Sequence, residues 1–313
     1  MTENMERTIA ADRSVVVLRA GPNEIGVAPA CGGSIAWYRT DHAGRCIDWL
    51  RPATPGALAG ANPEGMGCFP LVPFSNRVRN GRFRFRGRDV HLPLNVPGQP
   101  HAEHGHGWQA AWRLASHTDT SLVIEYRHKA GAWPFAYVAQ QIFRLGEEGL
   151  SVEIEAENLG DEAMPLGLGL HPYFPRTKRT RLAAHVEAMW DTDDEVMPTL
   201  LIAPPPGRQL TQGVAVDVEA MDNGFTGWRR RARIEWPEHG AALTLTASAP
   251  LDFLVVYTPP GEPYFCAEPV SHCTDAFNLA DQGRDDTGMA VLAAGQTLSA
   301  SVRFTPEITN NDT

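Results

Sequence analysis

Two segments of the sequence hold a single acid–base side chain in a setting that suits catalysis. His171 lies within residues 167–175 (GLGLHPYFP), where glycines precede the imidazole and aromatic residues follow it. Glu268 lies among apolar neighbours in residues 264–269 (YFCAEP). Burial raises the pKa of a carboxylate toward the range of a general base. Both side chains are catalytic candidates, each expected at a strand end, where Pro172 would stop the ladder beside His171.

Each candidate also has a plainer interpretation. A single histidine is most often a structural residue, and a buried glutamate is often paired with an arginine, here one such as Arg77. The two interpretations of Glu268 are compatible, because a paired carboxylate can still act as a base. For His171, the flanking glycines and aromatic residues favour an imidazole that faces a cavity.

A third segment, residues 101–108 (HAEHGHGW), contains three histidines and several glycines that disfavour regular structure. The pair His104 and His106 resembles part of a cupin metal site. Such a site needs a glutamate a few residues further on, and residues 109–112 are QAAW, so we expect no metal. Two alternatives remain open: a loop that presents one neutral imidazole to a ligand, and solvent-exposed histidines without a role.

Two further segments carry polar groups that suit ligand binding. Asn76 and Arg77 precede a predicted strand, and this combination can donate several hydrogen bonds to sugar hydroxyls or to a carboxylate. Taken alone, a surface arginine near a turn is the simpler interpretation. Asp222 opens the segment DNGF, which by itself is typical of a turn.

The elements that must position these side chains are predicted to be short β-strands, because hydrophobic residues recur mostly with a period of two. In residues 81–94, Phe83 and Phe85 alternate with arginines, which predicts a hairpin with one buried face and outward arginines. A second hairpin is expected over residues 135–157, with its turn at 146–149. The predicted fold class is all-β, a large antiparallel sandwich or barrel with few short helices. Further strands are expected at residues 14–19, 121–127, 241–247, 253–257 and 297–304.

Composition narrows the class of protein further. The chain has 313 residues, 43% of them hydrophobic, and a formal net charge of −10 without a block of lysines and arginines. We therefore expect neither a nucleic-acid partner nor an anionic membrane partner. Five cysteines without a CxxC pair disfavour a disulfide framework. Because neither a signal peptide nor a membrane-spanning run is found, we expect one cytoplasmic domain, residues 1–313, with a disordered tail at 309–313.

Taken together and in this order, the segments resemble the aldose 1-epimerase (mutarotase) family, whose best-known member is galactose mutarotase. The resemblance runs from about the first strands to Phe304. It implies a large antiparallel β-sandwich, sometimes called a supersandwich, in agreement with the strand pattern. The matching elements are Asn76-Arg77 with Gly81-Arg82-Phe83, His104-Gly105, His171-Pro172-Tyr173-Phe174, Asp222 to Phe225, and Glu268-Pro269.

The resemblance implies interconversion of the α and β anomers of an aldose by ring opening. This reaction requires removal of the proton on the C1 hydroxyl and protonation of the ring oxygen. By resemblance, Glu268 is the base and His171 the acid, and the two exchange roles after rotation about C1–C2. The partner is a small sugar, no cofactor or metal is required, and the oligomeric state is not indicated. The implied substrate-binding residues are Asn76, Arg77, His104 and Asp222.

The identity of the sugar is less constrained. Residues 69–74 (FPLVPF) depart from the galactose-specific pattern of the family. Hexose-6-phosphate mutarotases are a neighbouring branch, but a phosphate needs a cationic cluster, and alternation places the arginines of residues 82–88 on an outward face. We therefore expect a neutral aldose. Two other classes remain as alternatives: a sugar-binding protein without turnover, which would not need both His171 and Glu268, and a metal-dependent cupin-like enzyme, whose ligand set is incomplete.

Overall fold

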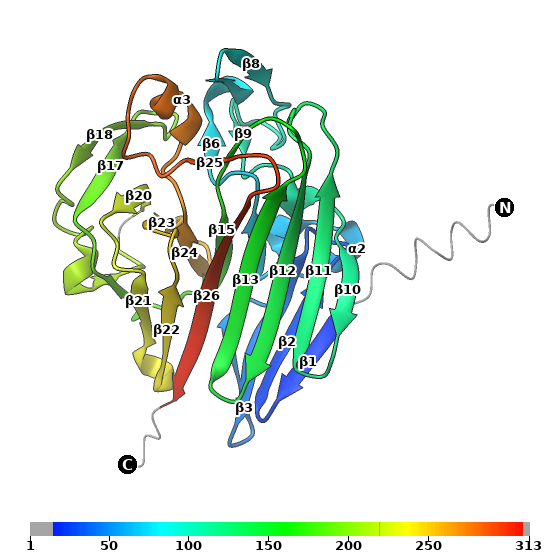
Figure 1. The fold of residues 1–313 in the computed structure, drawn as a ribbon. Helices are drawn as coiled ribbons and strands as arrows, with labels where there is room; N and C mark the ends of the chain where they lie inside the picture. The colour runs from blue at the N-terminus through cyan, green and yellow to red at the C-terminus, as the bar shows by residue number, and fades with distance from the viewer. Residues whose placement is uncertain (1–14, 219, 309–313) are drawn as a thin grey trace.

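The computed structural model describes residues 15–218 and 220–308, so the tail expected at 309–313 lies outside the described residues. Two large sheets, of 11 and 9 strands, lie face to face (Figure 1). Buried side chains from both sheets form one large hydrophobic cluster. This arrangement confirms the predicted all-β sandwich and its few short helices.

The larger sheet combines strands from the first, middle and last parts of the chain, which are brought side by side by antiparallel pairing. Its order is β1 (Val16–Ala20), β2 (Asn23–Ala28), β3 (Ser34–His42), β5 (Cys68–Leu71), β15 (Gly169–Pro175), β24 (Tyr264–Val270), β23 (Phe253–Tyr257), β20 (Asp222–Thr226), β17 (Ala188–Thr192) and β18 (Pro198–Ile202), with β4 (Arg45–Leu50) paired to β3.

The smaller sheet covers the other side of the core. Its order is β10 (Arg113–His117), β11 (Ser121–His128), β12 (Tyr137–Gly146), β13 (Gly149–Asn158), β26 (Thr297–Ile308), β22 (Ala241–Ala247), β21 (Arg231–Trp236), β16 (Arg181–Ala184) and β19 (Val214–Ala215).

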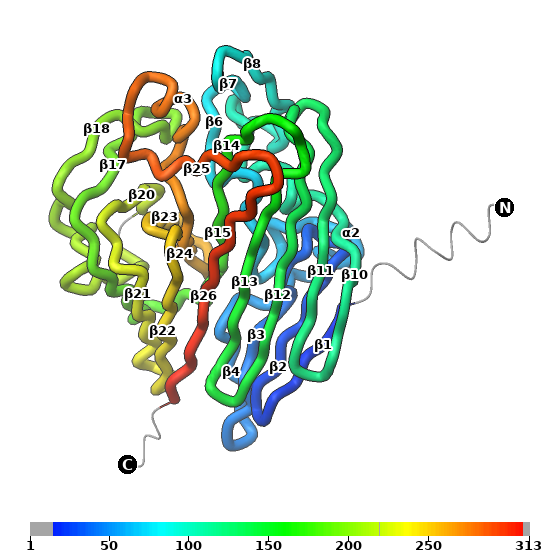
Figure 2. Tube along the Cα trace, in the orientation of Figure 1, coloured from blue at the N-terminus to red at the C-terminus, as the bar shows by residue number. Residues whose placement is uncertain are grey.

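Short elements connect the two sheets and gather mainly at one end of the sandwich, where β6–β8, β14, β25 and α3 lie (Figure 2). The paired strands are β6 (Arg77–Val78) with β9 (Ala102–Glu103), β7 (Arg82–Phe85) with β8 (Arg88–His91), and β14 (Met164–Leu166) with β25 (Ala290–Leu292). The α-helices are α2 (Ala57–Gly60) and α3 (Ala276–Asp281), and the 3₁₀ turns are Pro63–Gly65, Arg79–Gly81, Gly107–Gln109, Leu210–Gln212 and Pro237–His239.

Both hairpins predicted from alternation are present. β7 and β8 form the first, with Phe83 and Phe85 buried, and the four arginines of residues 82–88 exposed. β12 and β13 form the second, joined at residues 146–149. The outward orientation of the arginines is therefore confirmed.

Pro172 does not end its strand, contrary to the expectation from the sequence. β15 continues to Pro175, because β5 pairs with it from Gly169 to Pro172 and β24 pairs with it from Tyr173 to Pro175. On its other edge β15 pairs with β24 at Gly169 and again from Tyr173 to Pro175, with an interruption between. Proline lacks an N–H donor, which accounts for the gap in the ladder with β24, while the ladder with β5 continues through Pro172. His171 therefore lies inside a strand.

Two other local expectations were wrong for the same kind of reason. Glu268 lies within β24 rather than at its end. Asp222 begins strand β20, where the segment DNGF pairs with β23 instead of forming a turn. In both cases, pairing with a strand distant in sequence decides the local structure. Residue propensities describe only the local sequence, so they do not predict this pairing.

Among the described residues, no helix is long and apolar enough to cross a membrane. All five cysteines are free, as expected from their number and spacing.

A buried histidine ties the loop before β6 to the end of β24. His272 Nε2 accepts a hydrogen bond from the backbone N–H of Ser75 at 3.1 Å, and Nδ1 lies 2.7 Å from the carbonyl oxygen of Cys273. These partners require a neutral imidazole with its proton on Nδ1. Gly167 passes so close that an added Cβ would lie 1.8 Å from the ring of His272. Only glycine, which has no Cβ, fits at this position.

We expect His272 to make the fold sensitive to acid. Burial lowers the pKa of His272 to about 4 in the folded protein. Between about pH 6.5 and about pH 4, the unfolded chain therefore binds a proton at this histidine that the folded protein does not bind. The stabilisation is complete above the unfolded-state pKa and is lost as the pH falls, by about 1.4 kcal/mol per pH unit for one proton. His272→Gln removes this titration, so its free energy of unfolding should depend less on pH. Chemical denaturation at several pH values measures both slopes, and equal slopes would contradict the assignment.

Candidate active site

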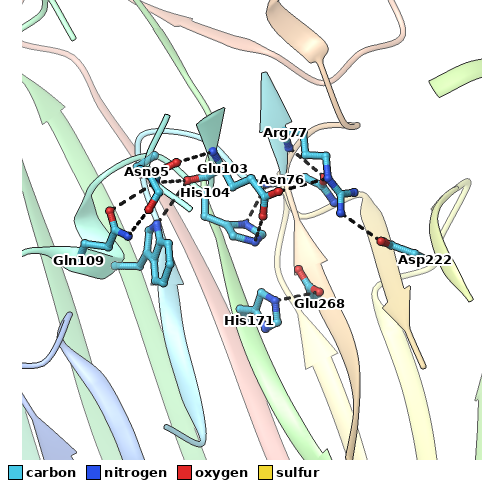
Figure 3. A network of polar contacts seen from close by, with 11 residues as sticks. Asn76, Arg77, Asn95, Glu103, His104, Gln109, His171, Asp222 and Glu268 are labelled. Carbon is cyan, nitrogen blue, oxygen red and sulfur yellow. Dashed lines mark hydrogen bonds and ion pairs between the residues drawn. The ribbon is translucent and has the colours of Figure 1, made fainter. Parts of the chain in front are cut away.

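Strand register places two titratable side chains opposite each other. β15 and β24 keep one register on both sides of the gap, in which Tyr173 lies opposite Cys266. Two residues further along each strand, His171 lies opposite Glu268, and side chains at this spacing share one face of a sheet. His171 Nε2 lies 3.3 Å from Glu268 Oε1 (Figure 3). The structure thus brings together the acid and base nominated from the sequence.

The surroundings favour the neutral form of both groups. Glu268 is 2% exposed and His171 is 7% exposed. Burial raises the pKa of Glu268 well above its ordinary value, and the charge of Asp222 raises it further. Burial lowers the pKa of His171 well below its ordinary value, and His104 lowers it further. The raised pKa of Glu268 and the lowered pKa of His171 both favour a state in which the pair holds one proton and the carboxyl group of Glu268 carries it.

The pair is not fully satisfied by the protein. His171 Nδ1 and Glu268 Oε2 have no hydrogen-bond partner among the described residues. Such buried, unpartnered atoms are uncommon away from functional sites. The arrangement is therefore typical of groups that complete their hydrogen bonding with a ligand.

His104 lies on the loop after β9, where its backbone adopts a left-handed conformation with φ of 59°. Its Nδ1 accepts a hydrogen bond from the backbone N–H of Asn76 at 3.1 Å, which leaves the proton on Nε2. Burial, and then the charge of Arg77, lower the pKa of His104 to about 3. Two alternatives were left open for this segment. Its three histidines are not exposed, which disfavours solvent-exposed histidines, and His104 is a neutral imidazole on a loop.

Arg77 lies between two carboxylates. Its Nη2 is 3.2 Å from Asp222 Oδ2, and its Nε is 3.3 Å from Glu103 Oε1. The side chain of Arg77 is only 15% exposed. The plainer interpretation of Glu268, an ion pair with Arg77, is therefore wrong, because Asp222 and Glu103 occupy the guanidinium and Glu268 faces His171 (Figure 3).

Glu103 is a site residue that the sequence analysis missed. It lies opposite Arg77 in the short ladder of β6 and β9, and its Oε2 is 4.0 Å from His104 Nε2. Asn95 fixes its backbone from both sides, accepting from the N–H of Glu103 at 2.8 Å and donating to its carbonyl oxygen at 2.7 Å. The sequence offers one hint of this role, because Glu103 directly precedes His104. The hint is useful only once His104 itself has been assigned to the site.

Asn76 acts mainly on the local backbone. Its φ is 57°, and its Oδ1 accepts a hydrogen bond from the N–H of Arg77 at 2.9 Å. The residue also lines the pocket described below. Asn76 therefore orients both Arg77 and His104, in addition to the binding role expected for it.

These side chains surround one cavity of about 330 Å³, a volume within the range of roughly 300–1,000 Å³ typical of small-molecule sites. Aromatic rings form part of its wall, and the ring of Phe69 packs 4.4 Å from that of His171. The lining residues are Glu64, Phe69, Asn76, Arg77, Val96, Gln99, Glu103, His104, Trp108, His171, Tyr173, Asp222, Tyr257, Tyr264 and Glu268. All six site residues expected from the sequence are therefore in one cavity.

The two histidines of the HxH pair do not converge. His104 lines the cavity, whereas His106 Nε2 lies 2.8 Å from the hydroxyl of Tyr137 and its ring packs 4.2 Å from that of His128. The pair therefore does not form the half-site of a cupin-like metal centre.

A different group has suitable metal ligands close together. One ligand atom each of His171, Cys266 and Glu268 lies within 4.8 Å of the others. Burial raises the pKa of the Cys266 thiol well above its ordinary value, which opposes the thiolate that a metal would need. The expectation that no metal is required remains a prediction.

Comparison with known proteins defines the class. A family model described as aldose 1-epimerase matches residues 25–305. The chain belongs to the aldose 1-epimerase family. The uncharacterized Escherichia coli K12 protein YphB is 33% identical over 288 residues, which cover 88% of this chain and 97% of YphB.

Solved structures show the same fold. An Escherichia coli K12 crystal structure superposes with a TM-score of 0.86 at 29% identity, covering 95% of this chain and 99% of the other. A galactose mutarotase-like protein from Clostridium acetobutylicum has a TM-score of 0.84 at 20% identity, covering 94% and 95%. The expected supersandwich is thereby confirmed.

We expect the imidazole of His171 to stay neutral as the pH falls through its ordinary pKa of 6.5, because burial holds its pKa well below that value. Ring-nitrogen chemical shifts recorded by NMR from about pH 8 to about pH 5 report the charge of a histidine directly. His171→Asn identifies the signal. A charged imidazole at neutral pH would contradict the shared proton and indicate an ion pair with Glu268.

Proposed function

We propose that the protein is a mutarotase that interconverts the α and β anomers of a neutral aldose by acid–base ring opening and reclosure. The observation that supports this most is the buried contact of 3.3 Å between His171 Nε2 and Glu268 Oε1 in a cavity of sugar size. Family membership is the second support.

The proton count closes with these two groups alone. In one direction, the Glu268 carboxylate removes the proton from O1 while protonated His171 donates to O5, so the C1–O5 bond breaks and a C1=O1 bond forms. After rotation about C1–C2, the carboxyl group of Glu268 returns a proton to O1 and neutral His171 takes the O5 proton as O5 attacks C1. The pair carries one proton throughout. The neutral state favoured by burial is one of the two working states.

His104 and Arg77 complete the proposal. The Nε2–H of His104 can donate a hydrogen bond to a sugar oxygen near the reacting centre, because Nδ1 is already used by Asn76. Arg77 can donate to hydroxyl groups, while Asp222 and Glu103 accept from them and hold the guanidinium in place. No redox or metal chemistry is needed for this proton count.

The charge of the cavity supports a neutral sugar over a sugar phosphate. Among the described residues that line it, Arg77 is the one cationic side chain, and it already faces two carboxylates. Glu64 adds a further carboxylate at the cavity. A phosphate would need several cationic donors, and the exposed arginines of residues 82–88 do not line the cavity.

The alternative of a binding protein without turnover is less well supported. Binding alone has no use for a buried, opposed acid and base, and burying ionisable groups is costly. Arg77, Asp222 and Glu103 would be enough to bind the hydroxyl groups of a sugar in the cavity.

Replacement of either member of the pair should abolish most of the catalysis. General acid or base catalysis contributes about 10²- to 10⁴-fold, so Glu268→Gln and His171→Asn should each lower kcat by at least that order, while sugar binding persists. Polarimetry of freshly dissolved α-anomers of several aldoses measures the rate above spontaneous mutarotation. Calorimetry checks sugar binding and circular dichroism checks folding. A folded Glu268→Gln protein with near-normal kcat would refute the assignment and favour the binding protein.

Glu103 should contribute to the exclusion of sugar phosphates. Glu103→Gln removes one negative charge beside Arg77, so the ratio of kcat/KM for a hexose 6-phosphate to that for the neutral hexose should rise by about tenfold, since like charges in a binding site are strongly unfavourable. Arg84→Ser with Arg86→Ser is the control on the outward hairpin and should leave both substrates within a few-fold. A rise in KM confined to sugar phosphates in that control would show that the phosphorylated branch is correct.

A further inference from the structure

The imidazole of His171 has little polar support from the protein. Its Nε2 lies 3.3 Å from Glu268 Oε1, and its Nδ1 has no hydrogen-bond partner among the described residues. In a histidine that acts as an acid or a base, the hydrogen bond of the second ring nitrogen is what commonly sets the state and orientation of the ring. Because the described residues supply no such bond, the plane of the His171 ring depends on the groups that pack against it.

Two aromatic rings pack against this imidazole. The ring centroids of Phe69 and Tyr173 lie 4.4 Å and 4.7 Å from that of His171, and the rings are inclined to it by 31° and 24°. Phe69 is buried and is supported in turn by Trp108, whose ring stacks on it at 5.0 Å. Tyr173 lines the cavity, so its ring needs support on the side that faces away from the imidazole.

Arg51 supplies this support. Its Cζ lies 3.9 Å from the ring centroid of Tyr173 and 4.5 Å from that of Tyr264, within the range of a cation–π interaction. A guanidinium and an imidazole this close to one ring cannot share a face of it, because non-bonded heavy atoms need about 3.5 Å of separation. Arg51 and His171 therefore lie on opposite faces of Tyr173, and the three side chains form one stack.

The guanidinium of Arg51 is anchored to the backbone. Its Nη2 donates to the carbonyl oxygen of Glu64 at 2.5 Å and to that of Met66 at 2.6 Å. Glu64 is an exposed residue at the rim of the cavity. A planar guanidinium donates such bonds from its edge while its face stacks on a ring, and a lysine ammonium cannot do both. The anchored stack is therefore specific to arginine.

Arg51 reaches the active site only through the tyrosines. It follows β4 directly, and its backbone N–H donates to the carbonyl oxygen of Tyr173 at 2.8 Å. Its side chain does not line the cavity that holds His171. It lines a separate hollow of about 450 Å³, which shares no lining residue with that cavity. Arg51 consequently has no direct contact with a sugar in the cavity.

We propose that Arg51 is a positioning residue for the acid–base pair, whose anchored guanidinium holds the ring of Tyr173 against His171 and thereby fixes the plane of the imidazole. This inference rests on the proposed mutarotase function, because that function makes His171 the acid. The expected consequence is a loss of turnover without a loss of sugar binding when the stack is broken.

The first experiment replaces Arg51 by methionine and by lysine. Polarimetry on the aldose that the wild type converts fastest should show that each variant lowers kcat by about tenfold, because small misplacements of a catalytic group are costly, and leaves KM within about twofold. Arg51→Lys keeps the positive charge and tests the planar geometry. If Arg51→Met does not fold by circular dichroism, Arg51→Lys carries the same prediction.

Arg45→Met is the matched control. Arg45 belongs to β4, is exposed, and lines the same separate hollow as Arg51 without lining the cavity. Loss of an arginine from this hollow should therefore leave both kcat and KM within about twofold.

A double-mutant cycle tests the route through Tyr173. Tyr173→Leu removes the ring that links Arg51 to His171 and should itself lower kcat. In that background, Arg51→Met should change kcat by less than about twofold, because independent sites give additive effects in free energy whereas residues that act through one another do not.

Three results would overturn the positioning role while the proposed function stands: wild-type kcat in Arg51→Lys, which would leave only the charge; a change confined to KM; or an undiminished tenfold loss from Arg51→Met in the Tyr173→Leu background. Failure of the wild type to accelerate any aldose would instead refute the proposed function, and this inference with it. The wild-type rate therefore separates the two kinds of failure.

Discussion

The register between β15 and β24 is the constraint on which the site depends. It sets His171 opposite Glu268 on one face of the larger sheet, so that their contact of 3.3 Å is fixed by backbone pairing on either side of it. A shift of one residue in either strand would turn one of the two side chains to the opposite face. The gap in the ladder next to Pro172 lies at this position, between two paired segments that hold the register.

The charges around this pair are arranged by different elements. Short strands β6 and β9 bring Arg77 and Glu103 together, and β20 in the large sheet supplies Asp222. The guanidinium is thus balanced by two carboxylates, while His171 and Glu268 contact each other in a buried environment that favours the neutral form of both. The ion pairs of Arg77 and the contact between His171 and Glu268 are therefore formed by adjacent groups, and Asp222 links them because its charge also raises the pKa of Glu268.

The sequence was sufficient for the fold class and for both hairpins, because alternation within a hairpin is a local signal. It was insufficient where distant strands meet. Pro172 and Asp222 looked like a strand end and a turn because their partners, β5 and β23, lie far away in the sequence. The order of motifs pointed to six residues that the structure places in one cavity. Glu103 was missed, because the pairing of β6 with β9 is what brings it there.

The close contact between Gly167 and His272 limits how this protein can diverge. Any side chain at position 167 would displace the imidazole, and His272 holds the backbone of Ser75, two residues before Arg77 in the chain. A mutation that never touches the cavity would thus be transmitted to Arg77, which lines it. Substitutions are consequently easier to accommodate at the exposed rim of the cavity than in the loop before β6, where each substitution must preserve a whole chain of contacts.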